Sequence, residues 1–363
     1  MAGERLEQLR RRIRNLDAAL LGLVAERLEL AREVGEVKRA AGVPLRDYEV
    51  ERRVLERGGE AAAAVGVAPE LARALLGPLI EESCRLQEID HYAAWSGEAE
   101  SVLVVGGAGR MGRWLARFCA TQGHRVVVCD PAAPAGGESV ASLEAGLAGA
   151  TLAFLATPLE STAAALDAVA ATGYRGVVCD VASLKGHLRP ALERARRAGA
   201  AVTSLHPMFG PAVRTLADRV IVVCDCGDPV ATERVTALFR GTAATLVALS
   251  IERHDRLVAW VLGLSHLANL AFARALAASG LSHAELAAVG STTFQSQMGT
   301  TASVVAESPD LYFAIQRLNP ETSAVAGGLA RALAEFAGWV EGDDPAAFAA
   351  AMRAAHAWVS DGG

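Results

Sequence analysis

The sequence predicts a multi-domain protein in which an all-α segment precedes an α/β doubly wound parallel sheet and a second all-α region. Three observations predict this class. The chain has 363 residues, more than one hydrophobic core usually organises. Apolar residues recur at helical spacing near the N-terminus, whereas short aliphatic runs alternate with helix-compatible segments in the middle of the chain. From Ile251 onward the aliphatic runs end and Ala/Leu-rich helical segments remain.

Residues 1–92 are predicted to form an all-helical domain. From Arg5 to about Ala40, apolar side chains recur every three or four residues, which indicates one long amphipathic helix. Two shorter helices are expected at roughly 47–58 and 69–91. They are too short to cover the apolar stripe of a helix about 50 Å long. A partner chain is therefore expected, and we predict a homodimer.

Residues 101–249 are predicted to form the sheet domain, and residues 250–363 a helical substrate and dimerisation domain. The small and polar residues of segment 93–100 have no period and mark the boundary before the sheet. Runs such as SVLVV at 101–105 and RVVVC at 125–129 indicate strands buried on both faces, as in sheets built from βα units.

Composition and charge exclude several kinds of partner. The chain is 52% apolar and 21% charged, which excludes a wholly disordered protein. Its net charge of −6 offers no basic excess for phosphate contacts, so we expect no nucleic-acid partner. We also expect no membrane partner, because no apolar stretch looks long and uninterrupted enough to span a bilayer. Six cysteines without a CxxC pair predict buried thiols, no metal site and a cytoplasmic location.

A glycine-rich loop follows the first predicted strand of the sheet. Gly107, Gly109 and Gly112 have the GxGxxG spacing between a strand and a helix, which is typical of a Rossmann-like dinucleotide site. Gly107 is expected to make the tight turn, and Gly109 to let a pyrophosphate approach backbone N–H groups. Arg110 and Met111 complete the candidate cofactor-binding loop.

The expected cofactor is NAD. Asp130 ends the second strand, 23 residues after Gly107, where a carboxylate would accept hydrogen bonds from the adenosine ribose and repel a 2′-phosphate. A later loop that contains Thr157 and Pro158 is a candidate for the nicotinamide side, although an ordinary turn explains it nearly as well.

Three further motifs lie on the expected elements. They are DVASLK at 180–185, SLHPMFGP at 204–211 and SHL at 265–267. In this order they resemble the prephenate dehydrogenases over about residues 101–355. The resemblance implies loss of a hydride and carbon dioxide from a small-molecule substrate, with His206 taking the proton of the ring hydroxyl.

The same resemblance implies roles for other side chains of these motifs. Ser183 would orient the ring hydroxyl or the imidazole, and Lys185 and His266 would bind substrate. The histidines outside the motifs are interpreted as surface or helix residues, with His254 and Asp255 as a weaker second pair; they are His91, His124, His187, His254, His283 and His356.

The first ninety residues are similar to the all-helical chorismate mutases. Their reaction is a rearrangement without a covalent step, so cations and amides that hold a dicarboxylate and its ether oxygen suffice. The resemblance implies that Lys38 and Gln87 are catalytic, and that five other residues bind substrate, namely Arg10, Arg27, Asp47, Glu51 and Ser83. Arg10 would reach the site of a neighbouring subunit. A mutase fused ahead of a dehydrogenase is the layout of the bifunctional enzymes of tyrosine biosynthesis.

Lysine usage supports two of these assignments. The chain has 33 arginines but only two lysines, Lys38 and Lys185, and both fall within the motifs. A bias this strong suggests that these two positions need a compact ammonium, which a guanidinium does not imitate.

Two departures from the families leave alternatives open. Val50 stands where the mutases commonly have an arginine, and segment 291–303 lacks the carboxylate-binding arginine of the dehydrogenases. Arg214 or Arg317 is a candidate replacement. With fewer cations, the substrates could instead be the 4-amino-4-deoxy analogues of chorismate and prephenate, whose net charge is less negative. A generic NAD-dependent hydroxyacid dehydrogenase with a helical dimerisation module is a further alternative.

Overall fold

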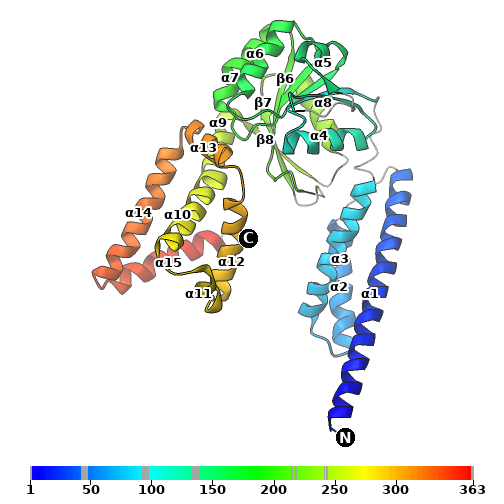
Figure 1. Cartoon of the computed structure of the whole chain (residues 1–363), viewed down its shortest axis with the longest axis vertical. Helices are drawn as coiled ribbons and strands as arrows, with labels where there is room; N and C mark the ends of the chain where they lie inside the picture. Colours follow the sequence, from blue (N-terminus) through cyan, green and yellow to red (C-terminus); the bar gives the residue numbers. More distant parts are fainter. Residues whose placement is uncertain are drawn as a thin grey trace. The chain divides into compact units, whose positions relative to one another are not determined.

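The computed structural model describes residues 2–41, 48–90, 98–132, 139–213, 216, 219–240, 242 and 244–360. The chain divides into two compact units. The first contains Met1–Ala182 and Arg189–Ser250, and the second contains Ser183–Leu188 and Ile251–Gly363. Figure 1 shows the elements, many of them labelled, with colours that follow the sequence.

The N-terminal segment consists of three helices, α1 (Ala2–Ala40), α2 (Tyr48–Ala64) and α3 (Pro69–Asp90). The predicted long first helix is confirmed. The second helix continues past Gly58, where the sequence predicted its end, because a glycine inside a helix costs only about 1 kcal/mol relative to alanine and does not by itself end the helix. A Cβ on Gly58 would lie 2.2 Å from a methyl group of Leu76, so the missing side chain lets α3 approach closely.

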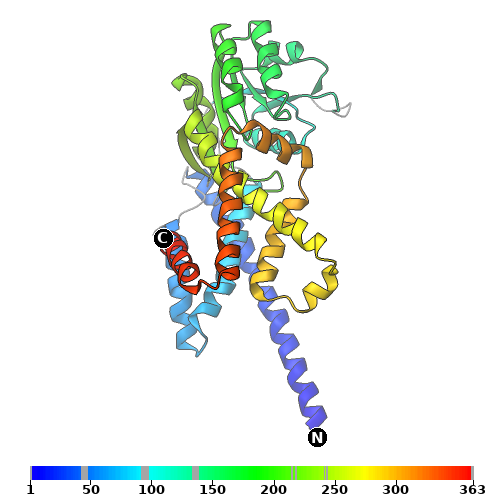
Figure 2. The same ribbon diagram turned by 90° about the vertical axis from the view of Figure 1, so that its left-hand side faces the viewer.

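The apolar stripe of α1 is exposed within one chain. Figures 1 and 2 both show the first turns of the N-terminal half of α1 extending beyond α2 and α3. Ile13 and Leu16 in this half expose 57% and 64% of their surface. Exposed leucines at helical spacing over several turns indicate an interaction surface.

The sheet has eight strands in the order β3-β2-β1-β4-β5-β6-β7-β8. The strands are β1 (Ser101–Val105), β2 (Arg125–Cys129), β3 (Ser139–Val140), β4 (Leu152–Leu155), β5 (Val177–Asp180), β6 (Ala201–Pro207), β7 (Val220–Asp225) and β8 (Thr245–Ser250). The predicted parallel sheet is confirmed, with one exception: β7 runs antiparallel to β6. The central strands β4 and β5 are buried along their whole length, as expected of parallel strands whose two faces are covered.

Helices cover both faces of the sheet. On one face, α4 (Arg110–Thr121) and α8 (Pro229–Arg240) meet through Phe118 and Phe239, whose rings stack with centroids 4.7 Å apart. The helices α5 (Leu143–Gly149), α6 (Thr162–Thr172) and α7 (Arg189–Arg197) pack on one another and lie together in Figure 1. The sheet is thus doubly wound, as predicted.

From Ile251 on, the described residues form helices without strands, as predicted. They are α9 (Ile251–Val258), a π-helical segment (Ala259–Leu264), α10 (Ser265–Ala278), α11 (His283–Ala288), α12 (Thr292–Val305), α13 (Pro309–Leu318), α14 (Thr322–Glu341) and α15 (Pro345–Ser360). The π-helical segment joins α9 to α10 without a break, so the two form one continuous helix.

This continuous helix corrects the expectation that no apolar stretch is long enough to span a bilayer. Ile251–Ala278 has the length and the composition of a membrane span. The same criterion is met by apolar helices that pack in protein interiors. The first turns of this helix carry His254 and Asp255, which are 0% and 5% exposed, so its N-terminal end is packed inside protein.

Candidate functional site

The glycine-rich loop makes a sharp turn between β1 and α4. The sequence pattern predicted the tight turn at Gly107. The structure corrects this, because Gly106 has the positive φ of 78° and therefore makes the left-handed turn. A Cβ on Gly112 would lie 2.1 Å from the carbonyl oxygen of Gly106, and one on Gly107 would lie 2.5 Å from Val128. Gly109 is the N-cap of α4 and offers no side-chain cap. The first backbone N–H groups of α4 can therefore bind an anion such as a pyrophosphate.

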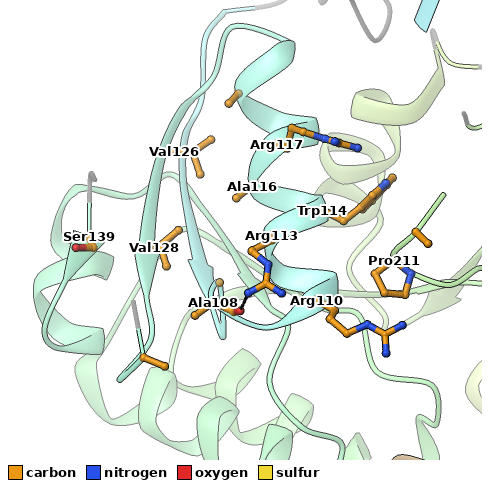
Figure 3. A pocket seen from close by; sticks show the side chains of 14 residues that line it. Ala108, Arg110, Arg113, Trp114, Ala116, Arg117, Val126, Val128, Ser139 and Pro211 are labelled. Atoms are coloured by element: carbon orange, nitrogen blue, oxygen red, sulfur yellow. Dashed lines mark hydrogen bonds between the residues drawn. The ribbon is translucent and has the colours of Figure 1, made fainter. Parts of the chain in front are cut away.

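A groove of about 1050 Å³ lies beside this loop. It is lined by the outer face of α4 and by β2, and Figure 3 shows Arg110, Arg113 and Arg117 along the helix. The guanidinium of Arg113 donates a hydrogen bond to the carbonyl of Ala108 and so fastens the loop to α4. Sequence reasoning missed Arg113 and Arg117. Their spacing of three and seven residues after Arg110 on one helix is the signal that could have found them.

Asp130 stands at the end of β2, where the sequence places it. Its Oδ2 accepts a hydrogen bond of 3.0 Å from the N–H of Ala108, and its Oδ1 accepts one of 2.8 Å from the N–H of Ala132. These bonds fix the carboxylate at the mouth of the glycine loop. An adenine dinucleotide without a 2′-phosphate fits this arrangement. The glycines leave room for its pyrophosphate, the start of α4 is uncapped, and the carboxylate can bind its ribose.

The loop after β4 packs against the glycine loop. A Cβ on Gly106 would lie 2.5 Å from the carbonyl oxygen of Ala156, so the two loops touch through backbone atoms. The Oγ1 atoms of Thr157 and Thr162 lie 2.9 Å apart, and the carbonyl of Pro158 accepts a 3.1 Å hydrogen bond from Thr162. The structure therefore brings this predicted loop next to the cofactor loop.

His206 lies near the end of β6 and is 4% exposed. Because β6 runs parallel to β5, its carboxyl end lies at the same edge of the sheet as the glycine loop. Strand pairing across β1, β4, β5 and β6 sets Ser204 level with Val105, the last residue of β1. His206 is two residues further along, about 7 Å beyond that level. His206 thus lies at the carboxyl ends of the parallel strands, where ligands bind in sheets of this kind.

The segment Ser183–Leu188 groups with the helices of the second unit. Lys185 is completely buried, which is rare for lysine, and Ser183 is half-buried. The backbone N–H groups of Lys185 and Gly186 donate hydrogen bonds of 2.9 and 2.7 Å to the carboxylate of Asp255.

In the described part of the chain, two buried histidines lie outside the motifs: His254, which is on helix α9 beside Asp255 as predicted, and His124, which corrects the prediction of a surface or helix residue. His254 is 0% exposed and lies with its Nδ1 2.7 Å from Oδ1 of Asp255. His124 is 5% exposed, and its Nδ1 accepts a hydrogen bond from the N–H of Glu100. The pair of His254 and Asp255 was predicted from the sequence, whereas the burial of His124 was not.

His266 begins α10 and is 8% exposed. Its ring stacks on Tyr312 of α13, with centroids 3.9 Å apart. Burial lowers the pKa of His266 below its ordinary value, so the imidazole is neutral near pH 7. Sequence reasoning missed Tyr312, because nothing in its local pattern links it to a histidine more than forty residues earlier.

The segment that lacks an arginine serves helix packing. Residues 292–305 form α12, where Gln297 and Thr301 donate hydrogen bonds of 2.9 and 2.8 Å to the side-chain oxygen of Asn269 on α10. Arg317, one of the two predicted replacements, is exposed on α13.

In the N-terminal helices, the structure brings Arg27 and Ser83 together. A guanidinium nitrogen of Arg27 donates a 2.6 Å hydrogen bond to Oγ of Ser83 and a 3.0 Å bond to the carbonyl of Leu79. Gln87, one turn further along α3, is 7% exposed, and Lys38 on α1 is half-buried.

Arg10 lies apart from these residues. It is 17 residues before Arg27, about 25 Å along the same helix, and pairs with Glu7 on the surface. Asp47 and Arg214 lie outside the described residues, as does the side chain of Glu51. Across the described ranges, no group of three or more His, Cys, Asp or Glu residues is placed to hold a metal ion.

Three family models match successive parts of the chain. Residues 9–88 match chorismate mutase type II, residues 135–248 the nucleotide-binding domain of prephenate dehydrogenase, and residues 250–354 its dimerization domain. The glycine loop precedes the second of these ranges, so its role depends on the geometry described above.

Individual relatives agree with these models. The T-protein of Enterobacter agglomerans is 29% identical over 98% of this chain and 93% of its own length. The 4-amino-4-deoxyprephenate dehydrogenase of Streptomyces pristinaespiralis is 30% identical over 68% of this chain and 87% of its own length. A crystal structure of prephenate dehydrogenase from A. aeolicus in complex with hydroxyphenyl propionate and NAD+ covers 73% of this chain and 99% of that chain. Its TM-score is 0.61 at 15% identity, which shows a shared fold.

The order of the matches along the chain decides the family. A helical mutase segment precedes a nucleotide-binding sheet and a helical dimerization domain, and the T-protein match spans all three. The two relatives named for amino substrates each match one part of the chain, the 4-amino-4-deoxyprephenate dehydrogenase 68% of it and a 4-amino-4-deoxychorismate mutase of the same organism 24% of it at 36% identity, whereas the T-protein combines both parts in one chain. The chain belongs to the family of bifunctional chorismate mutase/prephenate dehydrogenases.

Proposed function

We propose that the N-terminal helices rearrange chorismate to prephenate and that the rest of the chain oxidatively decarboxylates prephenate to 4-hydroxyphenylpyruvate. The observation that carries the second reaction is the position of His206. It is buried at the carboxyl end of β6, on the same side of the sheet as the glycine loop that follows β1. When bound, NAD would supply a hydride acceptor. Gly107, Gly109 and Gly112 would let its pyrophosphate approach α4, and Asp130 would hold its ribose.

In this proposal, the dehydrogenase residues remove the proton of the ring hydroxyl, and the substrate also loses a hydride and carbon dioxide. The imidazole of His206 accepts the proton of the ring hydroxyl, so that a carbonyl can form as the C–H bond breaks. Ser183 orients that hydroxyl, and the ammonium of Lys185 holds a carboxylate. His266, which burial keeps neutral, donates or accepts one hydrogen bond without adding charge. Loss of carbon dioxide then makes the ring aromatic and returns the proton to the ring oxygen.

For the mutase reaction, the proposal assigns binding and charge stabilisation. Arg27, held by Ser83 and the carbonyl of Leu79, binds a substrate carboxylate. Lys38 and Gln87 donate to the ether oxygen as its bond to the ring breaks. Arg10 would act in the site of a second subunit, because it is exposed and distant from Arg27 on α1.

Steady-state kinetics with hydroxyl and amino substrates test the proposed substrates. We expect kcat/KM for chorismate and for prephenate to exceed the values for the 4-amino-4-deoxy analogues by at least tenfold. Mutase turnover is followed without NAD, and dehydrogenase turnover as NADH formation. A reversed preference in both reactions would assign the chain to the amino substrates, and equal values would contradict the predicted selectivity.

The assembly and location are also proposals. The exposed apolar residues of α1 and the match to a dimerization domain support a homodimer. Six free cysteines, of which four are buried, suit a reducing cytosol. Light scattering on the purified chain should give twice the mass of 37.7 kDa.

Asp130→Ala is expected to reduce the preference for NAD over NADP at least tenfold. The variant loses both the hydrogen bonds to the ribose and the repulsion of a 2′-phosphate. The measurement is kcat/KM for each cofactor with prephenate at saturation. Asp225→Ala is the matched control, because Asp225 also ends a strand and accepts a backbone hydrogen bond from two residues on. An unchanged ratio in Asp130→Ala would contradict the assignment.

A further inference from the structure

The carboxylate of Asp255 joins two segments that are seventy residues apart in the sequence. Asp255 lies on α9 and is 5% exposed. Its Oδ1 accepts the N–H of Lys185 at 2.9 Å, and its Oδ2 accepts the N–H of Gly186 at 2.7 Å. A carboxylate that accepts two successive backbone N–H groups clamps the peptide between them at both ends.

Two neighbouring side chains hold Asp255 in place. Nδ1 of His254 lies 2.7 Å from Oδ1 of Asp255, and the side-chain amide of Asn319 donates a 2.9 Å hydrogen bond to the carbonyl of Asp255. Burial opposes ionisation of this carboxyl group, but the hydrogen bonds from His254, Gly186 and Lys185 outweigh it and lower the pKa of Asp255. The group is therefore ionised near pH 7 and accepts with both oxygens.

We propose that Asp255 is a positioning residue of the dehydrogenase reaction, which sets where Ser183 and Lys185 stand by clamping the backbone of their loop. The inference rests on the proposed function, which gives those two side chains their contacts with prephenate. Lys185 is completely buried, so its ammonium has little freedom to compensate for a shift of its backbone. Asp255 needs no contact with substrate for this role.

The loop side of the clamp offers an independent way to disturb it. A Cβ on Gly186 would lie 2.9 Å from Oδ2 of Asp255. The carboxylate cannot move away without losing its hydrogen bonds, so Gly186→Ala should open the clamp while keeping both carboxylate oxygens. In Asp255→Ala the obstructing oxygen is gone, and the added methyl group of Gly186→Ala meets no such contact.

The experiment combines these substitutions in the full-length chain. The variants are Asp255→Asn, Asp255→Ala, Gly186→Ala and the double variant Gly186→Ala/Asp255→Ala. The matched control is Glu252→Gln, which neutralises an exposed carboxylate on the same helix. For each, we measure kcat and KM for prephenate and for NAD, turnover of chorismate, thermal unfolding, and amide hydrogen exchange of Lys185 and Gly186.

We expect each single clamp variant to lower kcat/KM for prephenate at least tenfold, partly through a higher KM. The KM for NAD and the turnover of chorismate should stay within twofold of wild type, because both depend on other residues. The double variant should lose no more than about twofold beyond Asp255→Ala. Exchange at Lys185 and Gly186 should accelerate in the Asp255 variants, and Glu252→Gln should resemble wild type in every measurement.

Three results would overturn the inference. One is a value of kcat/KM for prephenate within twofold of wild type in Asp255→Asn and Gly186→Ala. Another is a fall in kcat that matches a loss of folded protein while KM stays unchanged, which a purely structural residue would produce. The third is a double variant whose losses multiply, because independent effects do not share a clamp. A wild-type chain that does not oxidise prephenate would instead refute the proposed function, and the exchange measurement would still decide whether Asp255 clamps the loop.

Discussion

His206→Asn is expected to lower NADH formation from prephenate by about a hundredfold or more, as loss of a general base typically does. Asparagine keeps a polar side chain of similar size on β6 but cannot accept the hydroxyl proton. Turnover of chorismate should not change, because the proposed mutase residues lie on α1 and α3. Both rates can be measured on one preparation, with NADH absorbance for the first and loss of chorismate for the second.

His124→Asn serves as the control for His206→Asn. His124 is a second buried histidine of the same unit, and its Nδ1 accepts a hydrogen bond from the N–H of Glu100. An asparagine oxygen can accept the same bond, so NADH formation should stay within about threefold of wild type by the usual size of such conservative effects. If His206→Asn retained wild-type dehydrogenase turnover, the assigned base would be wrong.

Lys38→Gln is expected to lower the mutase kcat by about a hundredfold, the usual cost of losing one charge-stabilising donor. Glutamine leaves a hydrogen-bond donor but removes the positive charge that stabilises the ether oxygen as its bond breaks. NADH formation from added prephenate should be unchanged. Loss of chorismate in the absence of NAD measures the first effect directly.

Lys38→Arg sharpens this prediction. It keeps the charge but replaces a compact ammonium by a planar guanidinium, so most of the mutase activity should still be lost. The chain has 33 arginines but only two lysines, which suggests that an arginine cannot replace the lysine at position 38. Full activity in Lys38→Gln would show that Lys38 is an ordinary surface lysine.

Most of the architecture could be predicted because its signals are local. Short apolar runs such as those of β1 and β4, separated by helix-compatible segments, predict buried strands, and the glycine spacing needs only its flanking strand and helix. The resemblance to two families added the roles of His206 and Lys38, which periodicity alone does not distinguish from structural residues.

The parts that could not be predicted depend on contacts distant in the sequence. Gly58 looks like a helix stop, but α2 continues through it, and its close approach to Leu76 of the next helix appears only in the folded chain. Asp255 looks like one acidic residue on a helix, and its clamp appears only when the loop at Lys185 folds against it. The prediction placed the tight turn at Gly107, one residue too late, because the glycine pattern does not reveal which glycine takes the positive φ.

The most direct test of two consecutive reactions in one chain is incubation of the purified wild-type protein with chorismate and NAD, with chorismate, NADH and 4-hydroxyphenylpyruvate followed separately. We expect chorismate to disappear with or without NAD. With NAD, one NADH and one 4-hydroxyphenylpyruvate should form for each chorismate consumed. Loss of chorismate without NADH, or NADH without the aromatic product, would contradict it.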